Sequence, residues 1–586
     1  MFVVKKKNGL TVKAYQGDAK TLLAFDLDKS KTDRLAGFTI ACKAGKFDPY
    51  FLFNKLQFAK PEDHAQNKKE PAYSSINAPI QKFRWLHVPS GLHTGKKFIT
   101  GKYLYTVTPR YFDEKGKLEA IDPKLSLDIS IGVQPFEKGD ISLGFTRGFV
   151  QSQAFENRFG KKAILKPAGA KLLFDTSKEA GKNNEGEAYT FLEEYEWSGF
   201  TAREQIFAVL DQVKKSKSLS LDIFAYDFNE PDVAQAVLDL AREGRVRMML
   251  DNATLHHSTT KELPEDLFEK AFRKAAKAPA DIQRGRFDRF QHNKIFIVKN
   301  KTKAVKVLTG STNFSVTGVY VNSNHILVFS NEKVAGLYSQ IYDEAWNAKL
   351  KATAFKKSPV ADKVFPFKGA GLPEMNITFA PHSEKFAKDT LDALVARVKK
   401  EKSSVFFAVM ELEKSGGPVV PALKALHKDT SVFTYGISDS TSDIVLYKPN
   451  TKTGVKVTGK TSGVVLPPPF DKEASIGLGH QVHHKFIVCG FNTPDAVVWG
   501  GSSNLALLGE QENGDNLLEI HDTDIATVFA IEALALVDHF HFRNANQEAA
   551  KSTKVKKTLN LYESNKWSLS YYDPKDLHCV DRLLFR

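Results

Sequence analysis

One pattern of residues occurs twice in this chain, and the two copies are separated by a constant interval. The first copy runs from His292 to Asn324 and the second from His483 to Asn516. In each copy a His-x-Lys pair is followed by Gly-Ser-x-Asn, and 483 − 292 gives an interval of 191 residues. The same interval separates Lys294 from Lys485, Asn313 from Asn504, and Asn322 from Asn513. A constant interval of this kind predicts two copies of one supersecondary unit.

The residues that follow each His-x-Lys pair predict short buried strands. Residues 295–298 and 486–488 are β-branched or aromatic runs, which are typical of strands in a core. Residues two apart on a strand share a face, so we expect the histidine and the lysine of each pair to point the same way. A second strand, 305–308 or 496–499, ends in the Gly-Ser-x-Asn turn, where glycine permits a close backbone approach.

Each copy therefore offers an imidazole, an ammonium group and a carboxamide, and two facing copies would offer two of each. Such a set supplies donors and positive charge for an anion, together with two groups that can carry protons. The motifs contain no acidic cage, so we expect neither a metal nor a cofactor at the site. Either motif alone is commonplace, but both motifs in the same order at one interval indicate function.

In these motifs the chain resembles the phospholipase D superfamily, over roughly residues 202–543. The resemblance implies a phosphodiesterase that works through a phosphohistidine intermediate without a metal. It implies that the catalytic residues are His292, Lys294, Asn313, His483, Lys485 and Asn504, supported by Ser311, Ser502, Asn324 and Asp515. The chain departs from the family pattern five residues after each motif lysine, where Lys299 and Gly490 replace an aspartate. That aspartate has mainly a supporting role in the family, so the nucleophile is expected to remain.

The same resemblance suggests different roles for the two histidines. The residue that supports the histidine would be Asn324 in the first copy and Asp515 in the second. A carboxylate stabilises an imidazolium ion more than an amide does. We therefore expect His292, beside Asn324, to be the neutral nucleophile, and His483, beside Asp515, to be the general acid and then the base. The reverse assignment stays open, because it depends on the alignment of the motifs.

The remaining motif residues are expected to act around the phosphate. The lysines and the asparagines of the Gly-Ser-x-Asn turns would hold the non-bridging oxygens as charge develops. Ser311 and Ser502 either assist in this or only shape the turn. His325 and His484 stand next to motif positions but are not expected to reach the phosphate.

A chain of 586 residues is too long for one core, so several domains are expected. The predicted fold class is α/β, with two pseudo-symmetric phospholipase D-like α-β-α subdomains preceded by a small β-rich domain. Strand-like patterns broken by turn signals, including residues 140–145, indicate that β-rich domain. The predicted division is a β-rich domain at 1–150, a connector at 151–200, the first subdomain at 201–350, a linker at 351–383, the second subdomain at 384–545, and a tail at 546–586 that packs on the body.

The charge balance suggests an anionic partner. The chain has 83 basic and 68 acidic residues and a net charge of +15, which fits nucleic acid, a membrane surface or a phosphorylated substrate. A lysine-rich solvated surface is the alternative explanation. Arg284, Arg286 and Arg289 lead directly into His292, where they would either attract phosphate or form a solvated face. A monomer would suffice, because both motifs are in one chain.

The N-terminal residues, the length of the apolar runs and the cysteines indicate where in the cell the protein is expected. The first residues contain no apolar stretch of the kind found in signal peptides, and no run approaches the roughly 18 apolar residues of a membrane-spanning helix. Cys42, Cys489 and Cys579 are odd in number and far apart, which indicates neither a disulfide framework nor a zinc site. We expect a cytoplasmic protein, although secretion is not excluded if a leader has been removed.

Three functions remain in competition. The preferred one is a nuclease or another phosphodiesterase acting on nucleic acid, favoured by the basic balance and the arginines. The second is a phospholipase D acting on phospholipids by hydrolysis or transphosphatidylation, for which residues 464–470 are the only candidate lid. The third is a non-catalytic protein that binds a phosphate polymer, suggested by Lys299 and Gly490. It ranks last because both His-x-Lys pairs and both asparagines are present.

Overall fold

The structure is a computed structural model. It describes residues 1–89, 91, 98–148, 153–160, 163–369, 371–414, 416–429, 431–439, 444–447, 455–457, 482–551 and 560–586. The long segment 440–480, with the candidate lid at 464–470, lies outside the described residues apart from two short strands.

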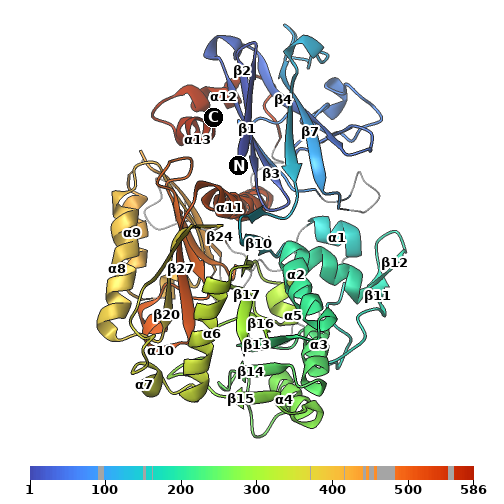
Figure 1. The fold of residues 1–586 in the computed structure, drawn as a ribbon. Coiled ribbons are helices and arrows are strands. Elements are labelled where there is room, and N and C mark those ends of the chain that lie inside the picture. The colour runs from blue at the N-terminus through green and yellow to red at the C-terminus, as the bar shows by residue number, and fades with distance from the viewer. Residues whose placement is uncertain are drawn as a thin grey trace.

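Two four-stranded antiparallel sheets form the N-terminal part of the chain, at the top of Figure 1. One sheet has the order β1 (Phe2–Lys7), β2 (Leu10–Gln16), β3 (Thr21–Leu27), β6 (Arg84–His87), and the other β5 (Tyr50–Phe51), β4 (Leu35–Ala44), β7 (Gly101–Tyr111), β8 (Leu127–Val133). Every second residue of β8 is buried, as expected of a strand with one face on a core. Trp567 and Tyr571 of the tail enter the same core, and the Trp567 indole donates a hydrogen bond of 2.9 Å to the Leu35 carbonyl.

The first motif lies in an eight-stranded sheet. Its order is β15 (Asp281–Arg284), β14 (Val246–Leu250), β13 (Leu219–Ala225), β16 (Ile295–Asn300), β17 (Lys303–Gly310), β18 (His325–Phe329), β10 (Ile141–Phe145), β9 (Glu137–Lys138). The helices of this half are α2 (Phe191–Lys215), α3 (Pro231–Arg242), α4 (Pro264–Ala275), α5 (Val316–Tyr320) and α6 (Glu332–Asn347).

Two features of this half correct the sequence-based division. The strand predicted at 140–145 was assigned to the N-terminal domain, but β10 pairs antiparallel with β18 in the first motif's sheet. Its alternating pattern identifies a strand without identifying the sheet it joins. The predicted connector 151–200 also contains the beginning of α2, which starts at Phe191 rather than Ala202 and bends at Phe200. A capping box between Thr190 and Glu193 starts this helix, and its Thr-x-x-Glu pattern was readable in the sequence.

The second motif lies in a nine-stranded sheet. Its order is β19 (Phe365–Gly369), β20 (Leu372–Ala380), β27 (Asp515–His521), β26 (Val497–Gly501), β25 (Lys485–Cys489), β21 (Ser404–Met410), β22 (Phe433–Asp439), β23 (Ile444–Tyr447), β24 (Val455–Val457). Its helices are α8 (Glu384–Lys400), α9 (Val419–Leu426), α10 (Leu507–Glu512) and α11 (Thr523–Lys551). The predicted linker 351–383 is wrong over β19 and β20, because β20 pairs with β27 in this sheet.

The strand orders of the two sheets correspond position by position. In sheet order, β9, β10, β18, β17, β16, β13 and β14 match β19, β20, β27, β26, β25, β21 and β22. The correspondence ends at the next strand, since β15 runs parallel to β14 whereas β23 runs antiparallel to β22.

The two sheets and their helices stack in layers (Figure 1). Helices α6 and α11 share one hydrophobic core with the facing sides of both sheets. Helices α2, α3 and α4 cover the outer side of the first sheet, and α8 and α9 cover the outer side of the second. Strand β16 therefore sends alternate residues into two cores, which explains its continuous apolar sequence.

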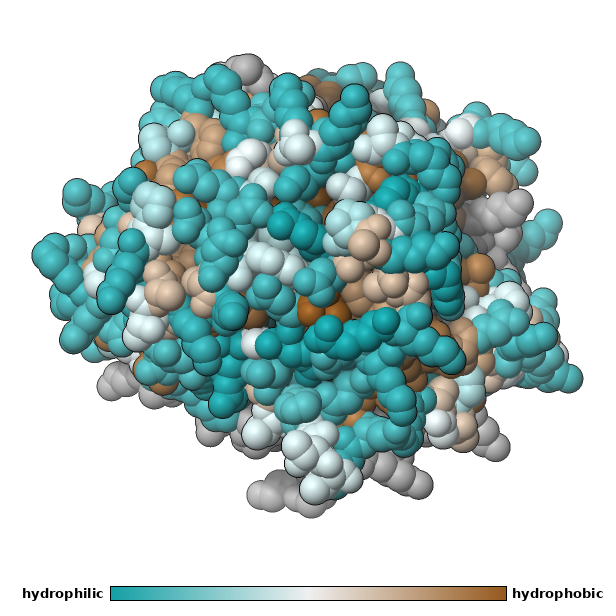
Figure 2. All heavy atoms as spheres, turned by 60° about the horizontal axis from the view of Figure 1, so that its bottom comes forward, coloured by the Kyte–Doolittle hydropathy of each residue, from teal (hydrophilic) through white to brown (hydrophobic). Residues whose placement is uncertain are grey.

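The face shown in Figure 2 is mostly hydrophilic, as expected when the apolar side chains are packed in internal cores. The side of the molecule turned forward in Figure 2 carries mainly hydrophilic side chains, with small and scattered hydrophobic patches. Among the described residues, none of the helices has the length and apolar character needed to cross a membrane.

Candidate active site

The two motif histidines line one cavity of about 260 Å³. His292 and His483 are only 5% and 6% exposed. Both precede their strands, since β16 begins at Ile295 and β25 at Lys485, close to the predicted starts at 295 and 486. Asn313 and Asn504, from the turns after β17 and β26, line the same cavity. The structure thus brings together four of the six predicted catalytic residues.

The backbone amide of each histidine forms a hydrogen bond to the backbone of the other copy. The His292 amide donates to the Gly514 carbonyl, and the His483 amide donates to the Ser323 carbonyl, both at 3.0 Å. Adding 191 to 292 and to 323 gives 483 and 514, so the two contacts are related by the interval of the repeat. Parallel bridges between Gln291 and Gly514 and between Ser323 and Val482 follow the same relation.

The side-chain partners of the histidines are exchanged relative to the expected pairing. His292 Nδ1 lies 2.8 Å from Asp515 Oδ1, whereas His483 Nδ1 lies 2.8 Å from Asn324 Oδ1. The prediction that Asn324 supports His292 and Asp515 supports His483 is therefore wrong. It assumed that support comes from the same copy, but the supporting segments cross between the copies.

These contacts define which ring nitrogen faces the substrate. A carboxylate can only accept, so His292 Nδ1 donates to Asp515. His483 Nδ1 also lies 3.1 Å from the Ser311 carbonyl, which again can only accept. Both histidines therefore hold their proton on Nδ1, so that Nε2 is the unprotonated ring nitrogen of each.

The two motif lysines lie beside the histidines and are fully buried. Lys294 Nζ donates to the backbone carbonyl of His292, and Lys485 Nζ to that of His483 at 2.8 Å. Lys485 Nζ also lies 3.3 Å from His483 Nε2, next to the nitrogen that faces the substrate. An ammonium group has three donors, so each lysine keeps donors beyond its bond to a carbonyl.

Burial shifts the protonation of these groups toward their neutral forms. Desolvation lowers the pKa of His292 to about 4, although the nearby charge of Asp515 acts in the opposite direction. Desolvation also lowers the pKa of Lys294 to about 7 and that of Lys485 well below its ordinary value. An anion in the cavity would favour the charged lysines, since opposite charge stabilises the ionised form.

The turns that carry the asparagines require glycine. Gly310 and Gly501 have φ values of +144° and +130°. A Cβ atom at these positions would lie 2.3 Å from the His325 carbonyl oxygen and 2.5 Å from that of Asn516. Only glycine tolerates this approach, and it fixes the turn against the neighbouring strand.

The motif serines belong to this scaffold rather than to the cavity wall. Ser311 Oγ donates to Asn324 Oδ1 at 2.8 Å, and therefore helps to orient the partner of His483. Ser502 Oγ accepts the Asn516 amide at 3.0 Å. Of the two functions considered for these serines, the structure supports the shaping of the turn.

The carboxamides of Asn313 and Asn504 have free hydrogen-bonding capacity. Their Oδ1 atoms are buried and have no hydrogen-bond partner among the described residues. Unsatisfied buried polar groups are rare in folded proteins, and often mark a place where a ligand or water binds.

The two residues that replace the family's aspartates lie away from the cavity. Lys299 Nζ contacts Asp222 Oδ2 at 3.1 Å, in an ion-pair network with Arg247. Gly490 stands at the end of β25 with a φ of +73°. Neither position lines the cavity or contacts a motif histidine.

Several cavity residues were missed from the sequence. Tyr226 packs its ring edge-on against His292 with centroids 4.8 Å apart, while Met410 ends the corresponding strand β21 and Glu411 follows it. A signal was available, because all three stand at the ends of the apolar runs 219–225 and 404–409. Of the three arginines before His292, only Arg289 lines the cavity, and Arg284 donates instead to the Glu265 and His256 carbonyls.

Behind the motifs, two pairs of side chains join the copies. His325 and His484 stack with centroids 5.4 Å apart and planes 7° apart. Asn516 Nδ2 donates to Asn293 Oδ1 at 3.1 Å. The interval of 191 relates these pairs, since 325 + 191 gives 516 and 293 + 191 gives 484. Neither His325 nor His484 lines the cavity, in line with the expectation that they do not reach the phosphate.

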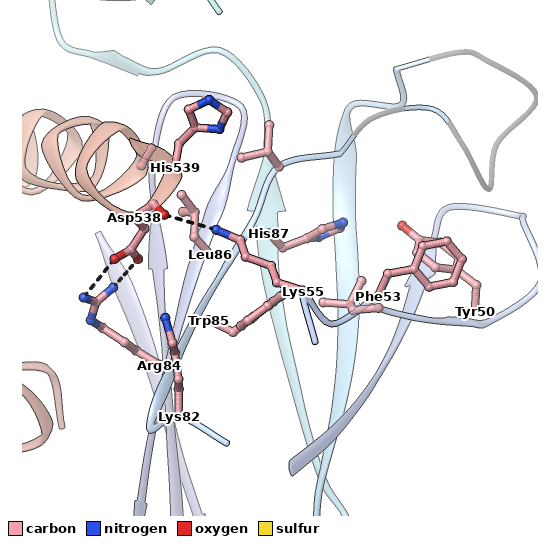
Figure 3. A pocket seen from close by; sticks show the side chains of 13 residues that line it. Tyr50, Phe53, Lys55, Lys82, Arg84, Trp85, Leu86, His87, Asp538 and His539 are labelled. Carbon is pink, nitrogen blue, oxygen red and sulfur yellow. Dashed lines mark hydrogen bonds and ion pairs between the residues drawn. The ribbon is translucent and has the colours of Figure 1, made fainter. Parts of the chain in front are cut away.

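A second cavity, of about 320 Å³, lies between β6 and α11 (Figure 3). Arg84 in its wall pairs with Asp538 and Asp581, and Lys55 donates to the Asp538 carbonyl. The cavity contains none of the motif residues, and its arginine is already neutralised by two carboxylates. The candidate active site is therefore the cavity that holds both histidines.

Comparisons with known proteins identify the part of the chain around the first motif. A family model described as "Cardiolipin synthase, PLD-like domain" matches residues 209–346. A phospholipase D from Rickettsia prowazekii (strain Madrid E) is 26% identical over 133 residues, which cover 22% of this chain and 58% of the relative. A mitochondrial cardiolipin hydrolase from Chlamydomonas reinhardtii is 26% identical over 133 residues, which cover 22% of this chain and 53% of the relative.

The chain thus spans a little more than half the length of the curated relatives that it matches. Among solved structures, Nuc from Salmonella typhimurium, a phospholipase D family member, is 24% identical and is covered to 88%, over 25% of this chain, with a TM-score of 0.21. The matched segment 209–346 contains the first His-x-Lys pair and its Gly-Ser-x-Asn turn. This segment, with its motifs, resembles the phospholipase D superfamily.

Proposed function

We propose that this protein is a phosphodiesterase that hydrolyses its substrate through a covalent phosphohistidine on His292. The observation that supports the proposal most directly is the pair of histidines on one cavity, each hydrogen-bonded at Nδ1 so that Nε2 is the nitrogen that can attack phosphorus or carry the transferred proton. One such nitrogen can attack phosphorus while the other donates a proton to the leaving oxygen.

We further propose that the two halves form one pseudo-twofold unit around this cavity. The matching strand orders of the two sheets support this arrangement. The contacts of His292 with Gly514 and of His483 with Ser323, related by the interval of 191 residues, support it at the site itself. In this arrangement a monomer contains a complete site.

The unequal partners of the histidines favour one assignment of roles. Attack through His292 Nε2 leaves a positively charged ring that carries the phosphoryl group and a proton on Nδ1. The Asp515 carboxylate stabilises this charge across a hydrogen bond of 2.8 Å. The acceptors at His483 Nδ1 are neutral, the Asn324 amide and the Ser311 carbonyl, so this hydrogen bond stabilises a protonated His483 less and favours the release of its proton.

The reaction would proceed in two balanced steps. In the first, His292 Nε2 forms a bond to phosphorus, the bond from phosphorus to the leaving oxygen breaks, and that oxygen takes the proton from His483 Nε2. In the second, His483 Nε2 accepts a proton from water, whose oxygen bonds to phosphorus as the P–N bond breaks. The products are an alcohol and a phosphomonoester, and His292 is regenerated in its neutral form.

The lysines and asparagines would hold the phosphate. The amide nitrogens of Asn313 and Asn504 can donate to the two non-bridging oxygens, and the lysines offer positive charge beside each histidine. Binding a phosphodiester would favour the charged form of Lys294, whose pKa desolvation lowers to about 7.

Nucleic acid is the substrate that we favour. The net charge of +15 and Arg289 in the cavity wall both suit an extended polyanion. A phospholipid is the second candidate, because two relatives that match the chain are named phospholipase D and mitochondrial cardiolipin hydrolase. A non-catalytic role is disfavoured, because both histidines keep their partners on a shared cavity.

The test is a parallel assay of the full chain on single-stranded DNA, RNA, phosphatidylcholine vesicles and cardiolipin vesicles. Wild type would be compared with His292→Ala and with His427→Gln, a buried histidine of the second half that does not line the cavity. We expect phosphodiester cleavage by wild type and by the control variant but not by His292→Ala. Cleavage that survives His292→Ala would contradict the proposal, and the preferred substrate would decide between nuclease and phospholipase.

A further inference from the structure

A second group of reactive side chains lies behind one wall of the active site. Asp227, His256 and Glu265 are all buried, and one ligand-type atom of each lies within 4.8 Å of those of the other two. Asp227 follows β13, His256 lies in the loop after β14, and Glu265 is in the first turn of α4. Strands β13 and β14 are parallel neighbours, so the segments after their carboxyl ends meet at one edge of the sheet.

The imidazole of His256 is oriented by a carboxylate outside the group. His256 Nδ1 lies 3.0 Å from Asp251 Oδ2 and therefore donates to it. Asp251 is itself fixed by the backbone amides of Ala253 and Gln291, each at 2.7 Å. His256 Nε2 is buried and has no hydrogen-bond partner within the described ranges of the chain. A histidine held in this way by a carboxylate is the usual arrangement of a metal-binding imidazole.

The carboxylate of Glu265 forms no ion pair among the described residues. Glu265 Oε1 accepts the Phe228 amide at 3.0 Å, but Oε2 is buried and has no hydrogen-bond partner in the part of the chain that the structure describes. Like charges as close as those of Asp227 and Glu265 destabilise each other, and either a proton or a cation between them would remove the repulsion.

We propose that Asp227, His256 and Glu265 bind one divalent transition-metal ion, with Zn²⁺ as the best fit. An imidazole with two carboxylates suits Zn²⁺, whereas Mg²⁺ and Ca²⁺ take oxygen ligands. Three protein ligands leave one position of a tetrahedral ion for water. Asp227 also lines the catalytic cavity, which gives the ion a route of entry.

The metal would position the active-site wall rather than take part in phosphoryl transfer. The Tyr226 ring packs edge-on against His256 at a centroid distance of 4.3 Å and against His292 at 4.8 Å. Lys294 Nζ lies 4.7 Å from the centre of the same ring. Fixing Asp227 and His256 would therefore fix Tyr226, which contacts both the nucleophile and a motif lysine.

The test measures metal binding to the full chain after chelation and desalting. Zn²⁺ binding would be followed by calorimetry and by metal analysis, and the ligand environment by the visible absorption of bound Co²⁺. We expect one ion per chain and a higher melting temperature with Zn²⁺. Glu265→Gln should weaken binding at least about tenfold, and Asp251→Asn, which loses the carboxylate that orients His256, by about 10- to 100-fold.

Glu194→Gln is the matched control. Glu194 is also fully buried, neither of its carboxylate oxygens has a hydrogen-bond partner among the described residues, and it is not part of the proposed metal group. It should bind Zn²⁺ like wild type, and so should the inactive His292→Ala, which separates this proposal from the catalytic one. Binding that Glu265→Gln retains would show that the ion sits on surface histidines, and would overturn the proposal. The absence of stoichiometric binding would overturn it too, and would leave a proton shared between Asp227 and Glu265.

Discussion

The two copies of the motif hold their histidines by the same backbone contact but with different side chains. His292 is paired with the carboxylate of Asp515 and His483 with the amide of Asn324, at the same distance of 2.8 Å. The scaffold is therefore repeated while the charge next to each histidine is not. The charge beside each imidazole decides how strongly its cationic form is stabilised. One repeated unit can therefore supply both a nucleophile and a general acid.

Removing each histidine should separate the two roles most clearly. His292→Ala should lower the rate by more than about 10²-fold on any substrate, and should form no covalent adduct. His483→Ala should be as impaired on a natural phosphodiester, but should still form the adduct with a p-nitrophenyl phosphodiester, whose leaving group needs little protonation. Intact-mass analysis or radiolabel trapping measures the adduct. An adduct on His483 in the His292→Ala protein would reverse the assignment.

Making the two partners alike should have the next largest effect. Asp515→Asn gives both histidines an amide, and should slow formation of the adduct by about 10- to 100-fold, as expected for loss of a charge-assisted hydrogen bond. Asn324→Asp gives both a carboxylate, and should slow only reactions with poor leaving groups. Single-turnover rates with p-nitrophenyl and alkyl phosphodiesters test this. Equal effects of both variants on both substrates would argue against unequal roles.

The pH profile of kcat/KM should have an acidic limb, because His292 must be neutral, and an alkaline limb, because Lys294 must be charged. The pKa of His292 is about 4 and that of Lys294 about 7, so kcat/KM should fall below pH 4, where His292 is protonated, and above pH 7, where Lys294 loses its charge. Each limb should fall by about tenfold per pH unit. Lys294→Met should be slower and should lose the part of the alkaline limb that Lys294 causes, so its profile should change near pH 7. An alkaline limb that persists in this variant would have to come from another group.

The His325–His484 pair and the Asn293–Asn516 pair should differ in how they make the free energy of unfolding depend on pH. Desolvation lowers the pKa of His325 and His484 in the folded protein, so the unfolded chain binds more protons below about pH 6.5. Stability should therefore fall as the pH drops below that value, by up to about 1.4 kcal/mol per pH unit for each histidine. Replacing both by asparagine, as in the Asn293–Asn516 pair, should flatten this dependence in denaturant unfolding. An unchanged slope would show that other groups cause it.

Chelation should have the smallest effect on turnover. The proposed metal group lies in the first half only, among the described residues, and the Tyr226 ring packs between its histidine, His256, and His292. EDTA should lower the melting temperature while turnover stays nearly unchanged, measured below the unfolding transition. If EDTA abolished turnover and a divalent ion restored it, phosphoryl transfer by the histidines alone would be wrong.

The sequence by itself determined the parts of the site that repeat. The interval of 191 residues identified the pairs His292 and His483 and Asn313 and Asn504, and all four line one cavity. It also indicated the α/β class, because buried apolar strands alternate with amphipathic helices in both halves. These features are local in the chain, so patterns of a few residues are sufficient to reveal them.

Only the tertiary structure decided what meets across the chain. The pairing of His292 with Asp515 joins residues 223 positions apart, and it reversed the pairing expected from the sequence. Strands β10 and β20 were assigned to the N-terminal domain and to the linker, since strand periodicity tells which residues share a face but not which strand lies beside them. Asp227, His256 and Glu265 carry no common spacing, and they meet only because β13 and β14 are parallel neighbours.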